Sequence, residues 1–481
     1  MEMTKELSPF KTAVVEQEAR TENNMKAYGS TLNSCVDLFY KIGASRGKNI
    51  TPDFTKAFVE NKDLAIRIAL WARDVRGGAG ERQLFRDILT LLAATDQPTL
   101  KAIVPKIPEL GRWDDLFYVT GDARNEALTL IKAALENGDG LCAKWMPRKG
   151  LNSVHLRNFL KLTPKQYRKM LVGITNVVET PMCSGNWDNI EFGHVPSLAH
   201  ARYKKAFLKN APIVYKTYID GLETGETKIN AGAVYPYDVL KTVIGSGRYG
   251  VQNFSEAESK QIIAQWAALP DFMNDKNVLP IVDVSGSMSS PVGGGAKKVS
   301  LTCMDVAVSL GLYVADKNKG NFKDVFMTFS GSPQIEVLRG NIIEKTLQLS
   351  TADWDMNTDL HAAFDKLLEV ATKNKVPAED MPAMLLIMSD MQFDQCVKYD
   401  NSAIEMIRIK YEAQGYPMPA VVFWNINAYD NAPVRFNEKG VALVSGFSPT
   451  ILKSLLAGNL DQITPMNMML DTITNQRYAW L

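Results

Sequence analysis

The feature that most restricts the fold of this 481-residue chain is a change in hydrophobic periodicity near residue 270. Before that point, apolar residues recur every three or four positions, as on one face of a helix. After it, short apolar runs alternate with helical stretches. A length of this size suggests roughly two to four domains. We therefore predict two domains, residues 1–270 and 271–481, which meet near Leu269-Pro270-Asp271.

The first half is predicted to be all-α. Its clearest helical patterns cover residues 63–75, 83–95 and 126–136. Segments rich in glycine separate the helices, at residues 77–80, 111, 138–140 and 245–250. This arrangement predicts a stack of helical hairpins. The sequence has no strict repeat, so periodicity alone predicts helices rather than a solenoid or ring of HEAT-like hairpins.

The second half is predicted to be a doubly wound, Rossmann-like α/β domain. Apolar runs typical of buried parallel strands cover residues 278–284, 325–329, 384–388, 420–424 and 441–444. Helical stretches lie between or after them, at residues 298–317, 359–372, 403–414 and 450–456. Such alternation indicates right-handed β-α-β crossovers and an open sheet. Ligands of these folds bind at the carboxyl ends of the strands.

The overall composition excludes several classes of protein. Hydrophobic residues make up 46% and charged residues 22%, which is typical of globular domains. The five cysteines are scattered without a Cys-x-x-Cys pair, which argues against a disulfide framework or a zinc ribbon. The first ten residues contain Glu2, Lys5 and Glu6 rather than an apolar core, and no apolar run reaches membrane-spanning length. We expect a soluble, cytoplasmic monomer that does not associate with membranes.

The net charge of +1 conceals two halves of opposite sign. Residues 1–270 contain 36 Lys and Arg against 29 Asp and Glu, whereas the remainder contains 18 against 24. Two long stretches of the first half, residues 141–178 and 192–219, contain basic and aromatic side chains but no acidic residue. Basic side chains neutralise phosphates and aromatic faces stack unpaired bases, so these stretches favour nucleic acid. The alternative is a solvated helix face.

The first predicted strand of the second half runs directly into Asp283-Val284-Ser285-Gly286-Ser287. One carboxylate and two hydroxyls at alternate positions are hard oxygen ligands, which Mg²⁺ prefers. Two further loops at the same predicted sheet edge carry Thr358 and Asp390, although Thr351 could replace Thr358. The sequence therefore predicts a Mg²⁺ site. In the alternative interpretation the two serines only cap the next helix.

No enzymatic signature accompanies this motif. The serines and Cys303 have no evident base beside them, and only His361 lies anywhere near. The Gly-x-Ser-x-Gly elbow and the P-loop are both absent from the sequence. We therefore predict that the chain is not an enzyme.

The metal motif and its α/β context closely resemble a von Willebrand factor A domain with a metal-ion-dependent adhesion site (MIDAS). The resemblance implies that Mg²⁺, or another divalent cation, is held by Asp283, Ser285, Ser287, Thr358 and Asp390. It also implies a coordination position left open for the carboxylate of a protein partner.

The order of the two halves resembles the Ro ribonucleoproteins, in which an α-helical, HEAT-like TROVE ring precedes a von Willebrand A domain. The similarity is closest to a related family of unknown function found in plants, fungi, bacteria and phages. It rests on residues 73–82, 111–116, 162–169, 184–188, 195–199, 201–203, 357–359 and 389–394, together with the metal motif.

The resemblance implies binding of single-stranded RNA ends or structured noncoding RNA by the basic half. The implied RNA-binding residues are Lys144, Arg148, Lys149, His155, Arg157, Lys161, Arg168, Lys169, Arg202 and Lys205. The alternative function is a metal-dependent protein-interaction or assembly scaffold that binds no RNA.

Overall fold

The computed structural model describes residues 18–480, except residues 22, 24, 176, 230, 232–233, 250–253, 293–300, 330–331, 351–358, 394–402, 430 and 459. The chain forms two compact units. The sheet unit comprises Met1–Ile68, Tyr235–Asn253 and Asp271–Arg477. The helical unit comprises Ala69–Val234, Phe254–Pro270 and Tyr478–Leu481.

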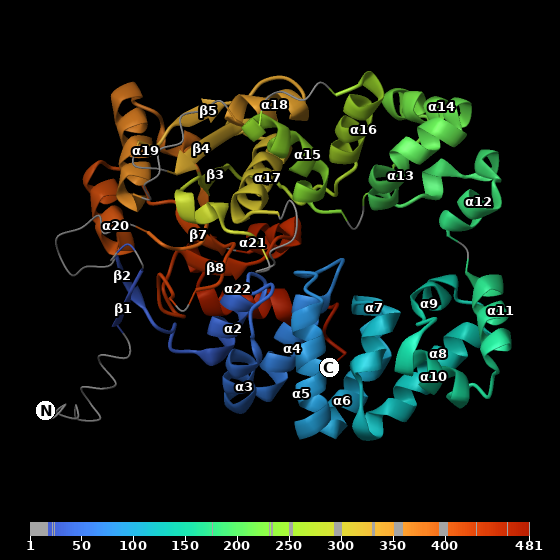
Figure 1. Cartoon of the computed structure of the whole chain (residues 1–481). Coiled ribbons are helices and arrows are strands. Elements are labelled where there is room, and N and C mark those ends of the chain that lie inside the picture. Colours follow the sequence, from blue (N-terminus) through green and yellow to red (C-terminus); the bar gives the residue numbers. More distant parts are fainter. Residues whose placement is uncertain are drawn as a thin grey trace, which may run out of the picture. The chain divides into compact units, whose positions relative to one another are not determined.

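The sheet unit is built around a six-stranded mixed sheet (Figure 1). Its strand order is β5-β4-β3-β6-β7-β8, and only the edge pair β4 and β5 is antiparallel. The strands are β3 (Val278–Asp283), β4 (Val325–Phe329), β5 (Ile335–Val337), β6 (Met384–Ser389), β7 (Ala420–Asn425) and β8 (Val441–Ser445).

The five predicted parallel strands are confirmed within one or two residues. Every residue of β3, β6, β7 and β8 is buried, as expected where both faces of a parallel sheet are covered. The sequence missed β5 because it is only three residues long and none of its residues is fully buried. It also missed a small hairpin of β1 (Glu18–Arg20) and β2 (Lys26–Tyr28).

Helices pack against this sheet at short distances. In α17, Gly311 lies so close to β3 that an added Cβ would stand 2.5 Å from the Val282 side chain. The glycine therefore allows the helix to approach the strand. The helices of the unit are α2 (Ser34–Ile42), α3 (Thr51–Glu60), α15 (Pro236–Tyr249), α17 (Cys303–Lys317), α18 (Ile342–Ser350), α19 (Leu360–Asn374), α20 (Ala403–Ala413), α21 (Leu452–Ala457) and α22 (Pro465–Ile473).

Residues near the N-terminus belong to the sheet unit because α2 packs against β8. The Ser445 hydroxyl donates to the carbonyl of Phe39 at 2.8 Å and accepts from the amide of Gly43 at 3.1 Å. A Cβ at Gly43 would stand 2.6 Å from the Ser445 carbonyl oxygen, so glycine is required there. The compact units therefore do not follow the sequence boundary near residue 270, since residues four hundred positions apart are joined by direct hydrogen bonds.

The helical unit consists of short helices. The predicted helices at 63–75, 83–95 and 126–136 are observed as α4 (Lys62–Arg73), α5 (Gln83–Thr95) and α8 (Arg124–Glu136). No helix within the described ranges is both long and apolar enough to cross a bilayer. The other helices are α6 (Gln97–Ile103), α7 (Ile107–Leu110), α9 (Gly140–Trp145), α10 (Gly150–Phe159), α11 (Pro164–Ile174), α12 (Glu179–Ser184), α13 (Ser197–Asn210), α14 (Pro212–Thr224) and α16 (Glu256–Ala267).

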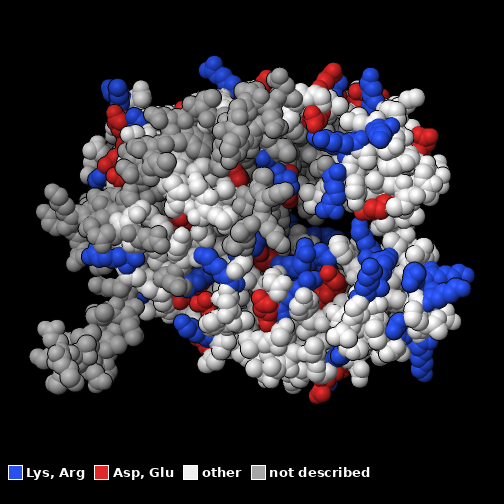
Figure 2. Space-filling view, in the orientation of Figure 1, with Lys and Arg blue, Asp and Glu red and all other residues white. Residues whose placement is uncertain are grey.

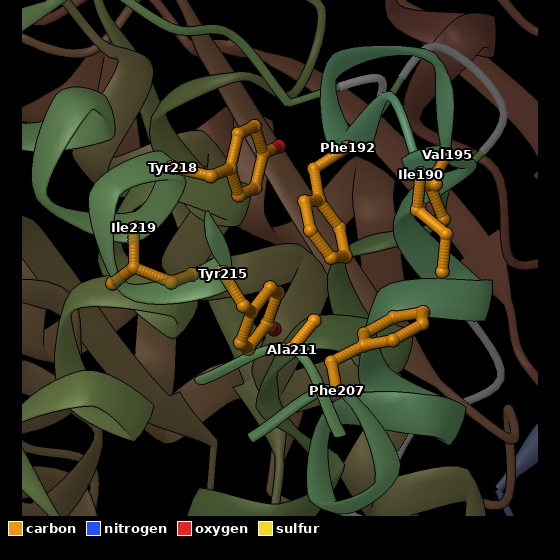
Figure 3. Packing of buried hydrophobic residues seen from close by; sticks show 8 residues of the cluster. All are labelled: Ile190, Phe192, Val195, Phe207, Ala211, Tyr215, Tyr218 and Ile219. Atoms are coloured by element: carbon orange, nitrogen blue, oxygen red, sulfur yellow. The ribbon is translucent and has the colours of Figure 1, made fainter. Parts of the chain in front are cut away.

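An aromatic core joins α13 and α14 (Figure 3). The Phe192 ring lies 5.0 Å from Phe207 and 4.9 Å from Tyr215, centroid to centroid. His200 is fully buried and stacks on Tyr218, with the ring planes 8° apart. Burial lowers the pKa of this histidine, so its uncharged form is favoured in the core. These rings stabilise the unit and are closed to a nucleic acid.

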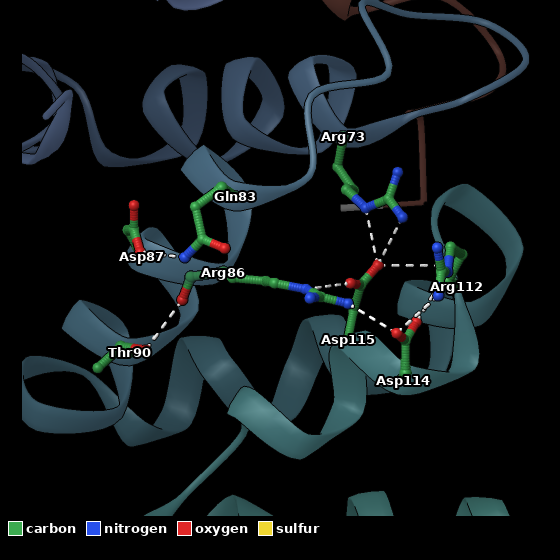
Figure 4. A network of polar contacts seen from close by, with 8 residues as sticks. All are labelled: Arg73, Gln83, Arg86, Asp87, Thr90, Arg112, Asp114 and Asp115. Carbon is green, nitrogen blue, oxygen red and sulfur yellow. Dashed lines mark hydrogen bonds and ion pairs between the residues drawn. The ribbon is translucent and has the colours of Figure 1, made fainter. Parts of the chain in front are cut away.

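A buried ionic network holds α4, α5 and the 3-10 turn Trp113–Tyr118 together (Figure 4). Asp115 is fully buried and accepts from Arg73 and Arg86, each at 2.7 Å. Asp114 pairs with Arg86 at 3.0 Å and with Arg112 at 2.8 Å. The network is long-range, since Arg73 and its partner Asp115 are 42 residues apart in the chain.

Candidate functional site

Two carboxylates lie at the carboxyl edge of the sheet. Asp283 is the last residue of β3, and Asp390 directly follows β6. The two strands are parallel neighbours, with Val282 opposite Met388, so their ends meet at the same edge. Both aspartates have no exposed surface. The sheet register thus brings together two predicted metal ligands that are 107 positions apart in the sequence.

Hydroxyl and amide groups surround Asp283. The Ser389 hydroxyl donates to Asp283 Oδ2 at 2.5 Å, and the amide of Ser285 donates to Oδ1 at 2.9 Å. The hydroxyls of Ser285 and Ser287 lie 3.0 Å apart. Ser285 precedes the short 3-10 helix Gly286–Ser289 without capping it through its side chain. The capping alternative therefore does not account for Ser285.

The electrostatics of this edge suit a cation. Burial, followed by the nearby Asp390 charge, raises the pKa of Asp283 well above its usual range. No described Lys or Arg forms an ion pair with Asp283. In the part of the chain that the structure describes, no group of three or more His, Cys, Asp or Glu side chains could hold a metal. The donor set would therefore be two carboxylates with hydroxyls, which fits the hard ligands that Mg²⁺ takes.

The third predicted loop of the metal site cannot be compared with the structure, whereas one further hydroxyl at this edge was not predicted. Thr358 and its alternative Thr351 both lie outside the described residues. Ser389 was not predicted, although its position just before Asp390 at the end of a buried strand was a usable signal. A cavity of about 820 Å³ in the same unit lies between β5 and α19. Its lining includes Gln334, Asp365 and Glu369 but neither Asp283 nor Asp390, so it is separate from the candidate metal site.

The first acid-free stretch folds into α9, α10 and α11, where blue side chains gather at the right of Figure 2. Most of the predicted RNA-binding residues in this stretch are exposed, and they lie on α10 and α11 or directly beside α10. Lys144 and Arg157 are half-buried. The exposed members are Arg148, Lys149, His155, Lys161, Arg168 and Lys169.

The second acid-free stretch contributes one face of α13. Arg202, Lys205 and Lys209 follow helical spacing and are exposed. On the same helix, Phe207 points into the aromatic core. The helix therefore has a buried aromatic face and an exposed basic face.

Many cations of these two stretches have no acidic partner among the described residues. Among the described residues, no carboxylate pairs with the ten lysines and arginines of the two stretches named at the end of this paragraph. Neighbouring cations are neutralised: Lys204 pairs with Glu258, and Lys260 pairs with three carboxylates. The unpaired cations are Lys144, Arg148, Lys149, Arg157, Lys161, Lys165, Arg168, Lys169, Arg202 and Lys205.

The aromatic and imidazole groups of the first stretch have distinct roles. Tyr167 is buried and donates to the carbonyl of Pro147 at 3.0 Å, so it belongs to the core. Trp145 is half-buried, and the Arg112 guanidinium lies 3.3 Å from its ring centroid. His155 is exposed, and its Nδ1 lies 2.7 Å from an Arg124 nitrogen. Burial closes Tyr167 to stacking on a base, and a guanidinium already lies over the ring of Trp145.

A cavity of about 470 Å³ lies in the helical unit, between α9 and the segments before and after α12. Its lining includes Lys144 from the first acid-free stretch and His194 from the second. Glu179 also lines it, at the position where the first acid-free stretch ends. Glu179 was not among the predicted site residues.

Comparison with known proteins finds two family models, both described as domains of unknown function. DUF2828 matches residues 21–109 and 143–279, and DUF7788 matches residues 277–476. An uncharacterized protein of Acanthamoeba polyphaga mimivirus is 29% identical over 520 residues, which cover 94% of this chain and 86% of that protein. The crystal structure of the Deinococcus radiodurans Ro (RSR) protein matches with a TM-score of 0.46 and 16% identity, over 92% of this chain and 99% of that one.

Proposed function

We propose that the chain binds single-stranded ends or structured regions of noncoding RNA through the basic surface of its helical unit. The observation that carries this proposal is the set of Lys and Arg side chains along α9–α11 and α13 that have no acidic partner within the described part of the chain. The motifs that resemble the Ro ribonucleoproteins support the same function.

The physical argument rests on uncompensated charge. Several exposed cations on other helices are paired with nearby carboxylates, as Lys132 is with Glu136 on α8. No described carboxylate pairs with Arg168 or Lys169 on α11, or with Arg202 or Lys205 on α13. Such a surface attracts polyanions, because neutralised phosphates release condensed counterions. A solvated face with balanced charges would not have this property.

The test is the salt dependence of single-stranded RNA binding. We expect the logarithm of the association constant to fall linearly with the logarithm of salt concentration. The double change Arg168→Glu with Lys169→Glu should weaken binding and reduce the slope by about 1.4, since each phosphate contact on a single strand contributes about 0.7. Fluorescence anisotropy of a labelled oligonucleotide over a salt series measures both quantities.

The matched control is Lys373→Glu with Lys375→Glu. These lysines are exposed on the sheet unit, and their reversal changes the net charge by the same amount. If both double variants weaken RNA binding equally, only net charge matters and the surface has no specific role. Absence of binding to single-stranded RNA at low salt refutes the proposed function.

We further propose that the carboxyl edge of the sheet binds Mg²⁺ through Asp283, Ser285, Ser287 and Asp390. Buried carboxylates with adjacent hydroxyls support this site. A cation bound there supplies positive charge that the carboxylate of a protein partner could ligate, which would make the sheet unit a docking module rather than a catalytic one. This same observation favours the second candidate function, a metal-dependent scaffold without RNA.

A further inference from the structure

The turn that carries Asp390 has a backbone conformation that side chains other than glycine rarely adopt. Met391, the next residue, has a φ of 65°, which lies in the left-handed region. Its amide donates to the Ser389 hydroxyl at 2.9 Å, and the amide of Gln392 donates to Asp390 Oδ1 at 3.2 Å. The chain therefore turns sharply where β6 ends.

Two forces oppose this turn until a cation is bound. The first is the strain of a left-handed residue that has a side chain. The second is repulsion between Asp283 and Asp390, which lie near each other without exposed surface, where little water screens their charges. Such a turn persists only when the contacts around it hold it in place.

The N-terminal hairpin, blue at the left of Figure 1, supplies two of these contacts from the connection between β1 and β2. The Thr21 hydroxyl donates to the carbonyl of Phe393 at 2.6 Å. The side-chain amide of Asn23 donates to the carbonyl of Gln392 at 2.9 Å. Thr21 is 6% exposed, and its hydroxyl also accepts from the amide of Met25 at 2.9 Å. The two side chains thus bind the carbonyl groups that directly follow the turn.

The hairpin is itself fixed to the sheet unit. Tyr28 of β2 exchanges two backbone hydrogen bonds with Ala432, at 2.9 and 2.8 Å. The guanidinium of Arg435 lies 3.9 Å from the centroid of the Tyr28 ring, and it donates to the carbonyl of Ser30 at 2.9 Å. The hairpin is therefore an anchored support for the turn.

We propose that Thr21 and Asn23 are positioning residues of the Mg²⁺ site, which hold the turn so that the cation meets both carboxylates already in place. The proposal rests on the Mg²⁺ site proposed above. Without the hairpin contacts the turn would relax and Asp390 would move away from Asp283, so that the cation would have to order its own ligands. Supporting groups that do not touch a metal typically change its affinity by about 10–100-fold.

The test removes the Thr21 hydroxyl and keeps the shape of the side chain. Thr21→Val is expected to weaken Mg²⁺ binding about ten-fold, at the lower end of that range, because Thr21 acts through the backbone. Thr21→Ser keeps the donor and should retain most of the affinity. Asn23→Ala, at an exposed position, should weaken binding in the same direction. Isothermal titration calorimetry of the full chain measures the dissociation constants, with Asp283→Asn as the background for Mg²⁺ bound elsewhere.

The matched control is Thr346→Val on α18 of the same unit. Thr346 is 3% exposed, and its hydroxyl also donates to a backbone carbonyl at 2.6 Å, that of Ile342. This variant should lose stability as Thr21→Val does and keep its Mg²⁺ affinity. Hydrogen exchange in chelator gives a readout that does not need the metal. The amides of Met391 and Gln392 should exchange faster in Thr21→Val than in the control.

The possible outcomes separate this inference from the metal site on which it rests. Equal dissociation constants for Thr21→Val and the unmodified protein would overturn the positioning role and leave the Mg²⁺ site intact. Equal weakening by Thr21→Val and Thr346→Val would also overturn it, because the effect would then reflect stability alone. If the unmodified protein binds no more Mg²⁺ than Asp283→Asn does, both the site and the inference fail.

Discussion

Replacing Asp115 with alanine is expected to destabilise the helical unit by about 3–5 kcal/mol, the usual cost of breaking a buried ion pair. Arg73 is 1% exposed; its Nε donates to Asp115 Oδ2, and its Nη2 lies 2.7 Å from the same oxygen in an ion pair. The same oxygen accepts from the Arg112 amide at 3.0 Å, and Oδ1 accepts from Arg86. Without the carboxylate, Arg73 would remain buried and charged with no counterion. Removing the carboxylate alone should therefore destabilise the protein by more than the intact ion pair stabilises it.

Urea denaturation followed by circular dichroism measures this loss, and hydrogen exchange of α5 and α8 assigns it to the helical unit. The control is Asp114→Ala, because Asp114 is 24% exposed and its arginines remain partly hydrated. We expect that change to cost about 1 kcal/mol or less. The double change Arg73→Met with Asp115→Leu should be less destabilising than Asp115→Ala. A loss below about 1 kcal/mol for Asp115→Ala would contradict the assigned role.

The second large effect is expected at the candidate metal site. Asp283→Asn should abolish stabilisation by Mg²⁺, which for the unmodified protein reaches about 2.7 kcal/mol at a concentration one hundred times the dissociation constant. When a chelator removes Mg²⁺, the order of stability of the variant and the unmodified protein is expected to reverse. The variant should then be more stable by roughly 1–3 kcal/mol, because it removes one of two neighbouring buried negative charges. Thermal denaturation with Mg²⁺ and with chelator measures both effects.

The matched control is Asp365→Asn, which makes the same chemical change at an exposed carboxylate of the sheet unit. It should leave the Mg²⁺ effect intact. Stabilisation by Mg²⁺ that is equal in the Asp283 variant and in the unmodified protein would place the cation elsewhere. No stabilisation of either protein would remove the metal from the proposed function.

Much of the sheet unit was predictable because its strands are buried on both faces. Continuous apolar runs such as residues 384–388 have no other stable location in an α/β domain. The short edge strand β5 was missed because Ile335–Val337 is too short and too exposed to give a pattern. The packing of α2 on β8 was also missed, since no local signal links Gly43 to Ser445. The first failure reflects the length and exposure of a strand, and the second a contact between residues distant in the chain.

The two candidate sites differ in how far the sequence could predict them. The approach of Asp283 to Asp390 follows from the parallel register of β3 and β6, which strand order makes predictable. The basic surface could be named from composition, yet composition does not say whether Arg168 or Lys204 has an acidic partner. Only the fold showed that Lys204 is paired with Glu258 and that Arg168 has no described acidic partner.

The sequence by itself determined the local properties of this protein: the helical and α/β halves, the strands, the metal motif and the absence of acids from two long stretches. Periodicity and spacing carry this information because they reflect which side of each element is buried. The tertiary structure alone decided which charges are neutralised and where a cavity forms. Glu179 illustrates the difference, because in the sequence it only ends an acid-free stretch, whereas in the fold its Oε1 accepts from the hydroxyl of Tyr203, 24 positions further along the chain. Pairing and burial depend on residues distant in the chain, so no local pattern encodes them.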